Sequence, residues 1–498
     1  MNKSLLKTNQ YKETLKLWIT IFLSLNLVFF YYTSHNFIGN HDWDWVKGTH
    51  QILSLNTGLF EARFAKFILN VILFDGQIFP LLNTIFSFIL LSIGIVILIS
   101  YWQIKGNISK IIVGLSISLT PYILGWLYFP INILGNFSAI LFVALGLKLC
   151  QKNKKKYILL SIILYILALG VYPSTMEMML ICASFHHLLN NKKKLQQIFQ
   201  DFFIVIIALM FFKFLLYILI KYNLVYANYY NLQTIDFIEA LNRIPVTINL
   251  IFKQLIYTLP FFPFFLKLVG GCIILLAIFS TKLSIKNIIL WGIILSSSVI
   301  SAFISVSQTE VSFQPRINYY SITYIYAGSL AILLNNKQSL KNIGYFLGIS
   351  LICLFIKENI YAQKVWFLGK NAEEKMVERM IKRIEERANN YPLIPVMTSE
   401  ISLRPKYYNE KYQISSSYIL ESSFMVRHIP SGMFNFYYPT QLFYSYSQIS
   451  EISNELYNYL KTSTNPWPHE NGLFVDNKYV VINSTKEGIE AIKKQLPK

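Results

Sequence analysis

The stretch Ile78–Ile104 reads IFPLLNTIFSFILLSIGIVILISYWQI and contains no charged residue. A helix needs about 20 mainly apolar residues to cross the hydrocarbon core of a bilayer, and this stretch is longer than that. Lys105 and Lys110 follow directly, as expected where a span meets a membrane surface. The stretch therefore predicts a transmembrane helix, and it indicates the fold class of the whole chain.

Similar apolar segments run through most of the sequence. They are Leu15–Tyr32, Ile111–Tyr128, Ile131–Cys150, Tyr157–Val171, Thr175–Leu189, Phe202–Tyr222, Phe261–Ile278, Ile288–Val306, Ile317–Leu334 and Ile343–Ile356. Thr175–Leu189 is the weakest, because it is short and contains an acid and two histidines. Charged residues make up 14% of the chain, against about 25% in soluble proteins. We predict an all-α polytopic membrane protein with about 11 transmembrane helices.

The lysines between these segments predict an orientation. If all the segments cross, the lysine clusters fall on one side, which the positive-inside rule makes cytoplasmic, together with the N-terminus. The clusters are Lys3 to Lys12, Lys105 and Lys110, Lys152 to Lys156, Lys192–Lys194, Lys282 and Lys286, and Lys337 and Lys341. They also account for much of the net charge of +20. We therefore expect no nucleic-acid partner.

The chain after the last apolar segment differs in composition and predicts a second domain. Residues 1–357 form the predicted transmembrane domain, and residues 358–498 form a small soluble α+β domain outside the cytoplasmic membrane. Within the second domain, Ala372–Arg387 has the spacing of an amphipathic helix. Leu473–Val475 and Tyr479–Ile482 flank a turn signal and predict a β-hairpin.

The first outer loop holds the most unusual local sequence, HDWDW at residues 41–45. In an extended segment Asp42 and Asp44 point the same way, where they can share a metal ion or a proton. Either acid can instead act as a general base for an acceptor hydroxyl. The alternative is an interfacial loop with tryptophan anchors and solvated acids, and for an Asp-x-Asp pattern alone it carries more weight.

Three further sites place charged residues in the membrane or at its outer surface. Phe60–Phe67 predicts an amphipathic helix on the outer surface, with Glu61, Arg63 and Lys66 facing polar surroundings. Arg63 there either binds a phosphate or pairs with Glu61 or lipid headgroups. Arg316 stands at the outer start of a span against the general charge bias, so it is a candidate for an anionic headgroup or a plain anchor. Glu177 lies at membrane depth, where ionisable groups usually line a cavity, and the alternative is a role in helix packing. His186 and His187 are interpreted as interfacial residues.

Several motifs of known chemistry are absent from the sequence. It contains no Gly-rich phosphate loop or dinucleotide-binding fingerprint, which disfavours ATP-driven transport and a cytoplasmic nucleotide-sugar donor. It contains no zinc-protease motif and no Gly-x-Ser-x-Gly elbow.

Several short stretches between about Leu15 and Ile356 carry a family resemblance. They are Asp42–Asp44, Arg63–Lys66 leading to Pro80–Asn83, Thr120 through Pro130, Gly170–Tyr172 and Pro315–Arg316. In these the chain resembles the type C (GT-C) membrane glycosyltransferases, and more narrowly the phage-type O-antigen glucosyltransferases that cause serotype conversion.

The resemblance implies an enzyme of the bacterial cytoplasmic membrane that takes glucose or a related hexose from a polyprenyl-phosphate donor. The acceptor would be an envelope glycan such as O-antigen, part of lipopolysaccharide, reached among membrane lipids on the outer side. Asp42 or Asp44 would be the base or would bind a divalent metal ion, magnesium or manganese. Arg63, Lys66 and Arg316 would hold the donor phosphate. Residues expected to line the substrate site are His41, Trp43, Glu61, Tyr172, Glu177 and Tyr319.

Two other classes stay open. An O-antigen polymerase or ligase would use the same lipid-linked glycans, but it usually has a large outer loop between late spans, whereas the largest outer segment here is the C-terminal tail. A flippase or transporter predicts internal repeats and broken helices, and the sequence shows no convincing repeat.

Overall fold

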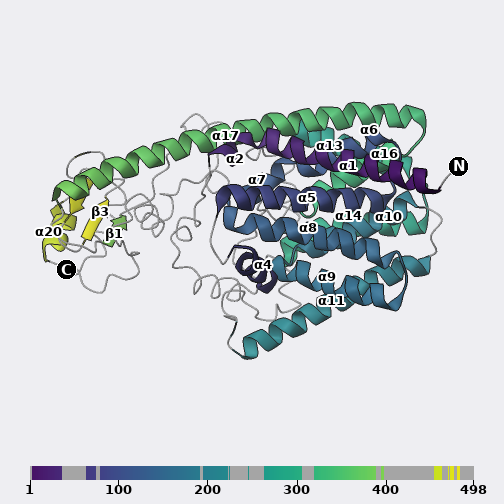
Figure 1. The fold of residues 1–498 in the computed structure, drawn as a ribbon, viewed down its shortest axis with the longest axis horizontal. Helices are drawn as coiled ribbons and strands as arrows, with labels where there is room; N and C mark the ends of the chain where they lie inside the picture. Colours follow the sequence, from purple (N-terminus) through teal and green to yellow (C-terminus); the bar gives the residue numbers. More distant parts are fainter. Residues whose placement is uncertain are drawn as a thin grey trace. The chain divides into compact units, whose positions relative to one another are not determined.

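The computed structural model of the 498-residue chain describes residues 3–35, 63–74, 79–190, 195–222, 263–304, 319–387, 394–397, 454–462, 472–475 and 479–482, and single positions 224, 245 and 469. These residues are mostly helical (Figure 1). The first helices are α1 (Lys3–Val28), α2 (Phe30–Ser34), α4 (Phe64–Phe74), α5 (Pro80–Trp102) and α6 (Asn107–Ser118). The next are α8 (Pro130–Cys150), α9 (Lys155–Val171), α10 (Thr175–Leu189) and α11 (Leu195–Lys221). The last are α13 (Phe264–Ser280), α14 (Ile285–Ile304), α16 (Ile322–Leu334), α17 (Gln338–Arg387) and α20 (Asn454–Thr462).

Each apolar segment predicted from the sequence is helical over most of its length. The predicted segment Ile111–Tyr128 is interrupted, because α6 ends at Ser118 and a 3₁₀ turn, Pro121–Ile123, leads into the short helix α7 (Leu124–Leu127). Proline lacks the N–H that would continue the α-helical hydrogen bonds, which explains the break.

Five described helical stretches are long and apolar enough to cross a membrane. They are Pro80–Trp102, Asn107–Leu127, Asn132–Cys150, Gln196–Lys221 and Gln338–Glu386. On α11, one of these, large apolar side chains such as Phe203, Met210 and Phe214 are exposed, as expected of a surface that faces lipid. An all-α membrane fold is therefore consistent with the structure, while the number of crossings stays a prediction.

The chain divides into two compact units. The first contains α1 to α16 and the part of α17 up to Ala362, apart from Tyr128–Ile131. The second contains the rest of α17 from Gln363, the strands and α20. The predicted boundary after residue 357 falls within α17, which is one continuous helix over 50 residues. The assignment of residues 358–498 to the far side of a membrane stays a prediction.

Helix α10 forms the core of the first unit. Every residue of α10 except Leu180 and Leu189 is buried, and the helix packs against α14, α16, α11 and α5 (Figure 1). Close approach to α16 depends on Gly328, because a Cβ at this position would collide with the ring of Phe185. Small residues allow such helix contacts in membrane proteins. Because α10 is buried on all sides, its sequence has no amphipathic pattern.

In the second unit a small sheet follows α17. Its strands are β1 (Ile394–Met397), β2 (Leu473–Val475) and β3 (Tyr479–Ile482), in the order β1-β3-β2. β2 and β3 are antiparallel, whereas β1 runs parallel to β3. The positions predicted for the last two strands are therefore confirmed.

The end of α17 also agrees with its predicted apolar face. Met376, Val377, Met380 and Ile384 are buried. Their spacing of three and four residues places them on one side of the helix. The sequence predicted this segment as a separate helix, but no proline interrupts residues 357–371, so the helix continues into it from the preceding apolar segment.

Candidate functional site

The structure describes five of the residues predicted for the site. They are Arg63, Lys66, Tyr172, Glu177 and Tyr319. The predicted catalytic acids and several neighbours lie outside the described residues, and their roles stay predictions: His41, Asp42, Trp43, Asp44, Glu61 and Arg316.

The start of α4 brings two cations into the helical unit. Arg63 directly precedes α4, and Lys66 lies in its first turn, where it is buried. Helix α4 packs on α9, and the absence of a side chain at Gly170 leaves room for the ring of Phe64. The Lys66 stem lies close to Gly135 of α8: a Cβ built there would be 3.0 Å from Lys66 Cγ. Lys66 is therefore packed between helices, whereas the sequence predicted that it faces polar surroundings.

Arg63 lies over an aromatic ring at the end of α9. Its Cζ is 5.0 Å from the ring centroid of Tyr172, within the range of a cation–π interaction. Tyr172 has extended dihedral angles (φ −155°, ψ 119°) and precedes Pro173, which explains why α9 ends at Val171. This local geometry turns the chain between α9 and α10 and places Tyr172 beside Arg63.

Tyr172 belongs to a group of buried rings that we call the aromatic cluster: Trp126, Tyr172, Tyr319, Tyr320 and Tyr324. The Tyr172 and Tyr320 rings are stacked with centroids 6.0 Å apart, and Trp126 meets Tyr172 edge-on at 4.8 Å. Tyr319 contacts Tyr320 at 5.8 Å and Tyr324 at 6.2 Å. The cluster joins the end of α9 to the start of α16 through the residues just after the Pro121 turn.

A hydrogen bond fixes the centre of the aromatic cluster. The hydroxyl of Tyr320 donates to the Asn136 main-chain oxygen at 3.3 Å and lies 3.4 Å from its side-chain oxygen. This contact connects the start of α16 to α8. A buried phenol usually has such a partner, so the orientation of the Tyr320 ring is set by both stacking and hydrogen bonding.

Glu177 is the acidic residue of this region. It lies in the first turn of α10 with 1% of its surface exposed. The Ser321 hydroxyl lies beside the carboxyl group, yet neither carboxylate oxygen has a hydrogen bond of acceptable geometry to any described residue. A buried polar group without partners is costly and needs an explanation. In a membrane protein such a group is typical of a binding site or pathway.

The described site thus combines cations, stacked rings and one carboxyl group. Arg63 and Lys66 offer positive charge at the N-terminus of α4, where the helix dipole also favours an anion. Tyr172 and Tyr320 connect Arg63 to the neighbourhood of Ser321 and Glu177. The arrangement can bind an anionic group through its cations and orient a polar, hydroxyl-bearing group through its carboxyl.

The sequence also predicted a site for a divalent metal ion. Among the described residues, no group of three or more histidine, cysteine, aspartate or glutamate side chains is arranged to hold a metal ion. The predicted ligands Asp42 and Asp44 lie outside that part of the chain, so metal binding there stays a prediction.

Sequence reasoning did not identify Trp126 or Asn136 as site residues. Trp126 falls in a stretch that carries the family resemblance, but its contact with Tyr172 depends on the turn at Pro121. Asn136 is a single polar residue in an apolar segment. A polar residue at membrane depth was the signal that could have identified it.

A second polar group lies at the other end of α10. His186 and His187 are both fully buried, whereas the sequence suggested an interfacial position. His187 Nε2 lies 2.9 Å from Asp201 Oδ2 of α11. The His186 ring stacks on Tyr101 with centroids 4.3 Å apart, and its Nε2 lies 3.1 Å from Gln151 Nε2. Partners from three other segments bury these histidines, and their spacing along the sequence does not reveal the contacts.

Comparison with protein-family models and with curated proteins finds no match for this chain. Any assignment of function therefore rests on the residues themselves and on their geometry.

Proposed function

We propose that the chain is an integral membrane glycosyltransferase of the GT-C type, which moves a hexose, with glucose as the expected sugar, from a polyprenyl-phosphate donor to a cell-envelope glycan such as O-antigen. The observation that supports this proposal most is the position of Arg63 over Tyr172 with Lys66 buried one turn later. A membrane protein that holds one cation over a buried ring and a second, buried cation one turn away has the chemistry needed for a lipid-linked phosphate.

In the proposed reaction, an acceptor hydroxyl oxygen bonds to the anomeric carbon of the sugar. The bond between that carbon and the phosphate oxygen breaks, and its electron pair leaves with the polyprenyl phosphate. Asp42 or Asp44 takes the hydroxyl proton. Arg63 and Lys66, with Arg316, stabilise the negative charge that develops on the phosphate.

The aromatic cluster and Glu177 are assigned to the sugar. Sugar rings present apolar C–H faces to aromatic side chains and hydroxyls to polar groups. Tyr172 and Tyr320 provide stacked rings, and the carboxylate oxygens of Glu177 are acceptors without hydrogen bonds to the described residues. The remaining predicted substrate residues, His41, Trp43, Glu61 and Tyr319, would complete the site.

The proposal includes a placement in the membrane. In it about 11 helices cross the bacterial cytoplasmic membrane, the N-terminus is cytoplasmic, and residues 358–498 form an α+β domain on the periplasmic side. A divalent metal ion, magnesium or manganese, would be held by Asp42 and Asp44. With this ion bound, its charge would assist the leaving phosphate.

The test compares Arg63→Ala with a matched cation–π pair. Lys156 Nζ lies 5.1 Å from the Tyr157 ring centroid, but Lys156 is exposed and lies at the opposite end of α9 from Tyr172. Membrane vesicles carrying each variant receive a radiolabelled polyprenyl-phosphate hexose, and label in the glycan is measured. We expect Arg63→Ala to lose about 100-fold or more of the transfer, while Lys156→Ala keeps it.

Other outcomes distinguish the alternatives. Mass spectrometry of envelope glycans from cells with and without the gene should show an added hexose. A change in chain length or in attachment to lipid, with no added hexose, would instead indicate a polymerase or ligase. Movement of the lipid-linked sugar across vesicles without covalent transfer would indicate a flippase. Equal transfer by Arg63→Ala and Lys156→Ala would contradict the assigned phosphate site.

A further inference from the structure

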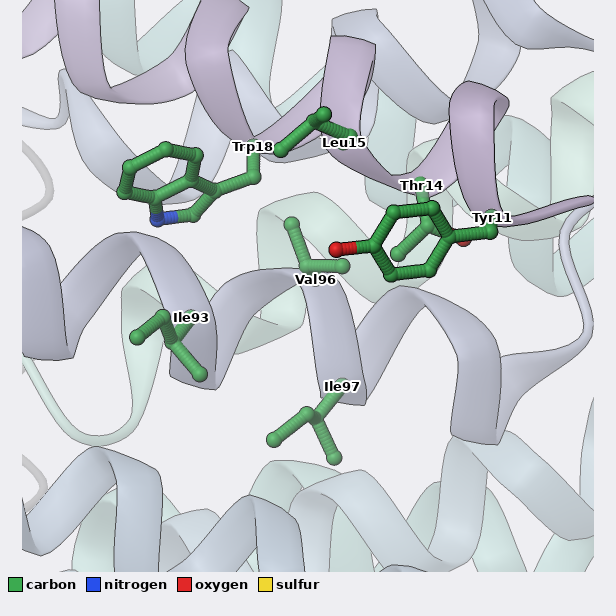
Figure 2. Close-up of a pocket in the computed structure, with 7 residues that line it drawn as sticks. All are labelled: Tyr11, Thr14, Leu15, Trp18, Ile93, Val96 and Ile97. Atoms are coloured by element: carbon green, nitrogen blue, oxygen red, sulfur yellow. The ribbon is translucent and has the colours of Figure 1, made fainter.

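A groove of about 240 Å³ opens between α1 and α5, and no residue of the aromatic cluster lines it (Figure 2). Tyr11, Thr14 and Trp18 line it from α1, and Ile93, Val96 and Ile97 line it from α5. Within each helix, neighbouring members of the set are one, three or four positions apart, so each set lies on one face of its helix. The groove surface is almost entirely apolar and α5 is apolar enough to cross a membrane, which indicates a lipid-facing position.

Two polar atoms stand out in this apolar groove. Figure 2 shows the Tyr11 ring reaching across the groove with its hydroxyl toward Val96, and the indole nitrogen of Trp18 on the side facing α5. Trp18 Nε1 is buried and donates no hydrogen bond to any described residue. A buried N–H without an acceptor is unfavourable. It indicates a ligand that brings an oxygen acceptor into an otherwise apolar site.

The charge along α1 indicates the rest of the ligand. Helical spacing places the positions of Lys3 and Lys7 two turns and one turn before Tyr11, on the stripe that continues with Thr14 and Trp18. Basic residues are thus followed by an aromatic ring and then by an apolar groove. The nearby acid on α1, Glu13, pairs with Lys110 of α6 at 3.6 Å, so it faces another helix.

We propose that this groove binds one anionic glycerophospholipid. An acyl chain lies against Ile93, Val96 and Ile97, an ester oxygen accepts the Trp18 N–H, and the lysine end of the stripe attracts the phosphate-bearing headgroup. Basic residues next to a membrane-embedded helix are attracted to anionic lipids, and aromatic residues prefer the headgroup level. This inference does not depend on the proposed glycosyl transfer.

The test uses the fluorescence of Trp18 in vesicles of defined composition. The full chain is reconstituted in phosphatidylcholine that contains increasing fractions of dibrominated phosphatidylglycerol or dibrominated phosphatidylcholine, whose bromines quench nearby tryptophans. The chain has eight tryptophans, so the Trp18 signal is obtained by subtracting the spectrum of Trp18→Phe. We expect the Trp18 signal to report a roughly ten- to thirty-fold preference for the anionic lipid.

Two variants separate a specific site from ordinary lipid contact. Lys3→Gln with Lys7→Gln should abolish the headgroup preference, whereas Lys154→Gln with Lys155→Gln, which removes the same charge at the exposed start of α9, should keep it. Val96→Phe fills the groove without changing charge and should weaken quenching by both lipids. Equal quenching by the two lipids in the natural chain, or unchanged quenching in Val96→Phe, would show annular lipid only and would overturn the proposal.

Discussion

The two ends of α10 bury ionisable groups in opposite ways. At its C-terminal end His187 Nε2 meets Asp201 at 2.9 Å, although its Nδ1 has no hydrogen bond to a described residue, and His186 contacts Gln151 just after α8 and Asn190 just after α10. At its N-terminal end both carboxylate oxygens of Glu177 have no hydrogen bond to the described residues. A paired group serves the stability of the fold, whereas an unsatisfied one costs stability and is typical of function. We infer that the helix joins a structural end to a functional end.

The largest effect on stability is expected from Asp201→Ala. The change leaves the fully buried His187 ring without its carboxylate partner, and removing one member of a buried pair costs about 3 kcal/mol. The melting temperature of the purified protein in detergent should fall clearly, while the transfer activity of the remaining folded protein should not change. A melting temperature equal to that of the natural chain would contradict the structural role.

Glu177→Gln should give the reverse pattern. The amide has the same shape, and no hydrogen bond to a described residue is lost, so the melting temperature should change by little. If Glu177 orients the sugar, the rate of hexose transfer should fall about 100-fold, as for other groups that act on the transition state. The measurement is the initial rate in vesicles at saturating donor. Large destabilisation with unaltered transfer per folded molecule would remove the contrast between the two ends of α10.

Tyr320→Phe should have the smallest effect. It removes the hydroxyl that bonds Asn136 but keeps the ring stacked on Tyr172. The loss of one buried hydrogen bond, with the acceptor left unsatisfied, costs about 1–2 kcal/mol. The melting temperature should fall less than for Asp201→Ala, and donor affinity should weaken only a few-fold. An effect on melting as large as that of Asp201→Ala would place the aromatic cluster with the structural end.

The sequence predicts the helices well and their contacts poorly. The bounds of α10 agree with the prediction because Pro173 precedes it and a lysine-rich segment follows, and both are local signals. The strands β2 and β3 agree because alternation and a turn signal are also local. The burial of His187 was missed, because Asp201 lies on the next helix and only the packing of α10 on α11 brings the pair together.

The candidate site was only partly predicted, because the sequence indicates single residues but not the contacts between them. Glu177 was identified as an acid at membrane depth, Arg63 by its place in a predicted amphipathic helix on the outer surface, and Tyr172 only through the family resemblance. The contacts that bring these residues together through Tyr320 depend on the interruption of the helix at Pro121 and on the packing of α4 against α9. No local sequence pattern encodes either feature. The roles of Asp42, Asp44 and Arg316 lie outside the described residues and rest on the sequence alone.

A substitution at Gly135 would move the charged group of Lys66 without changing the lysine itself. A methyl group there would stand 3.0–3.2 Å from two carbons of the Lys66 stem, so the lysine would shift by a few tenths of an ångström while its charge stayed intact. Chemistry that depends on distance can therefore be adjusted from a neighbouring helix by adding a single carbon atom. In the proposed reaction, such a substitution would retune the preference for a leaving group while every ionisable side chain stayed in place.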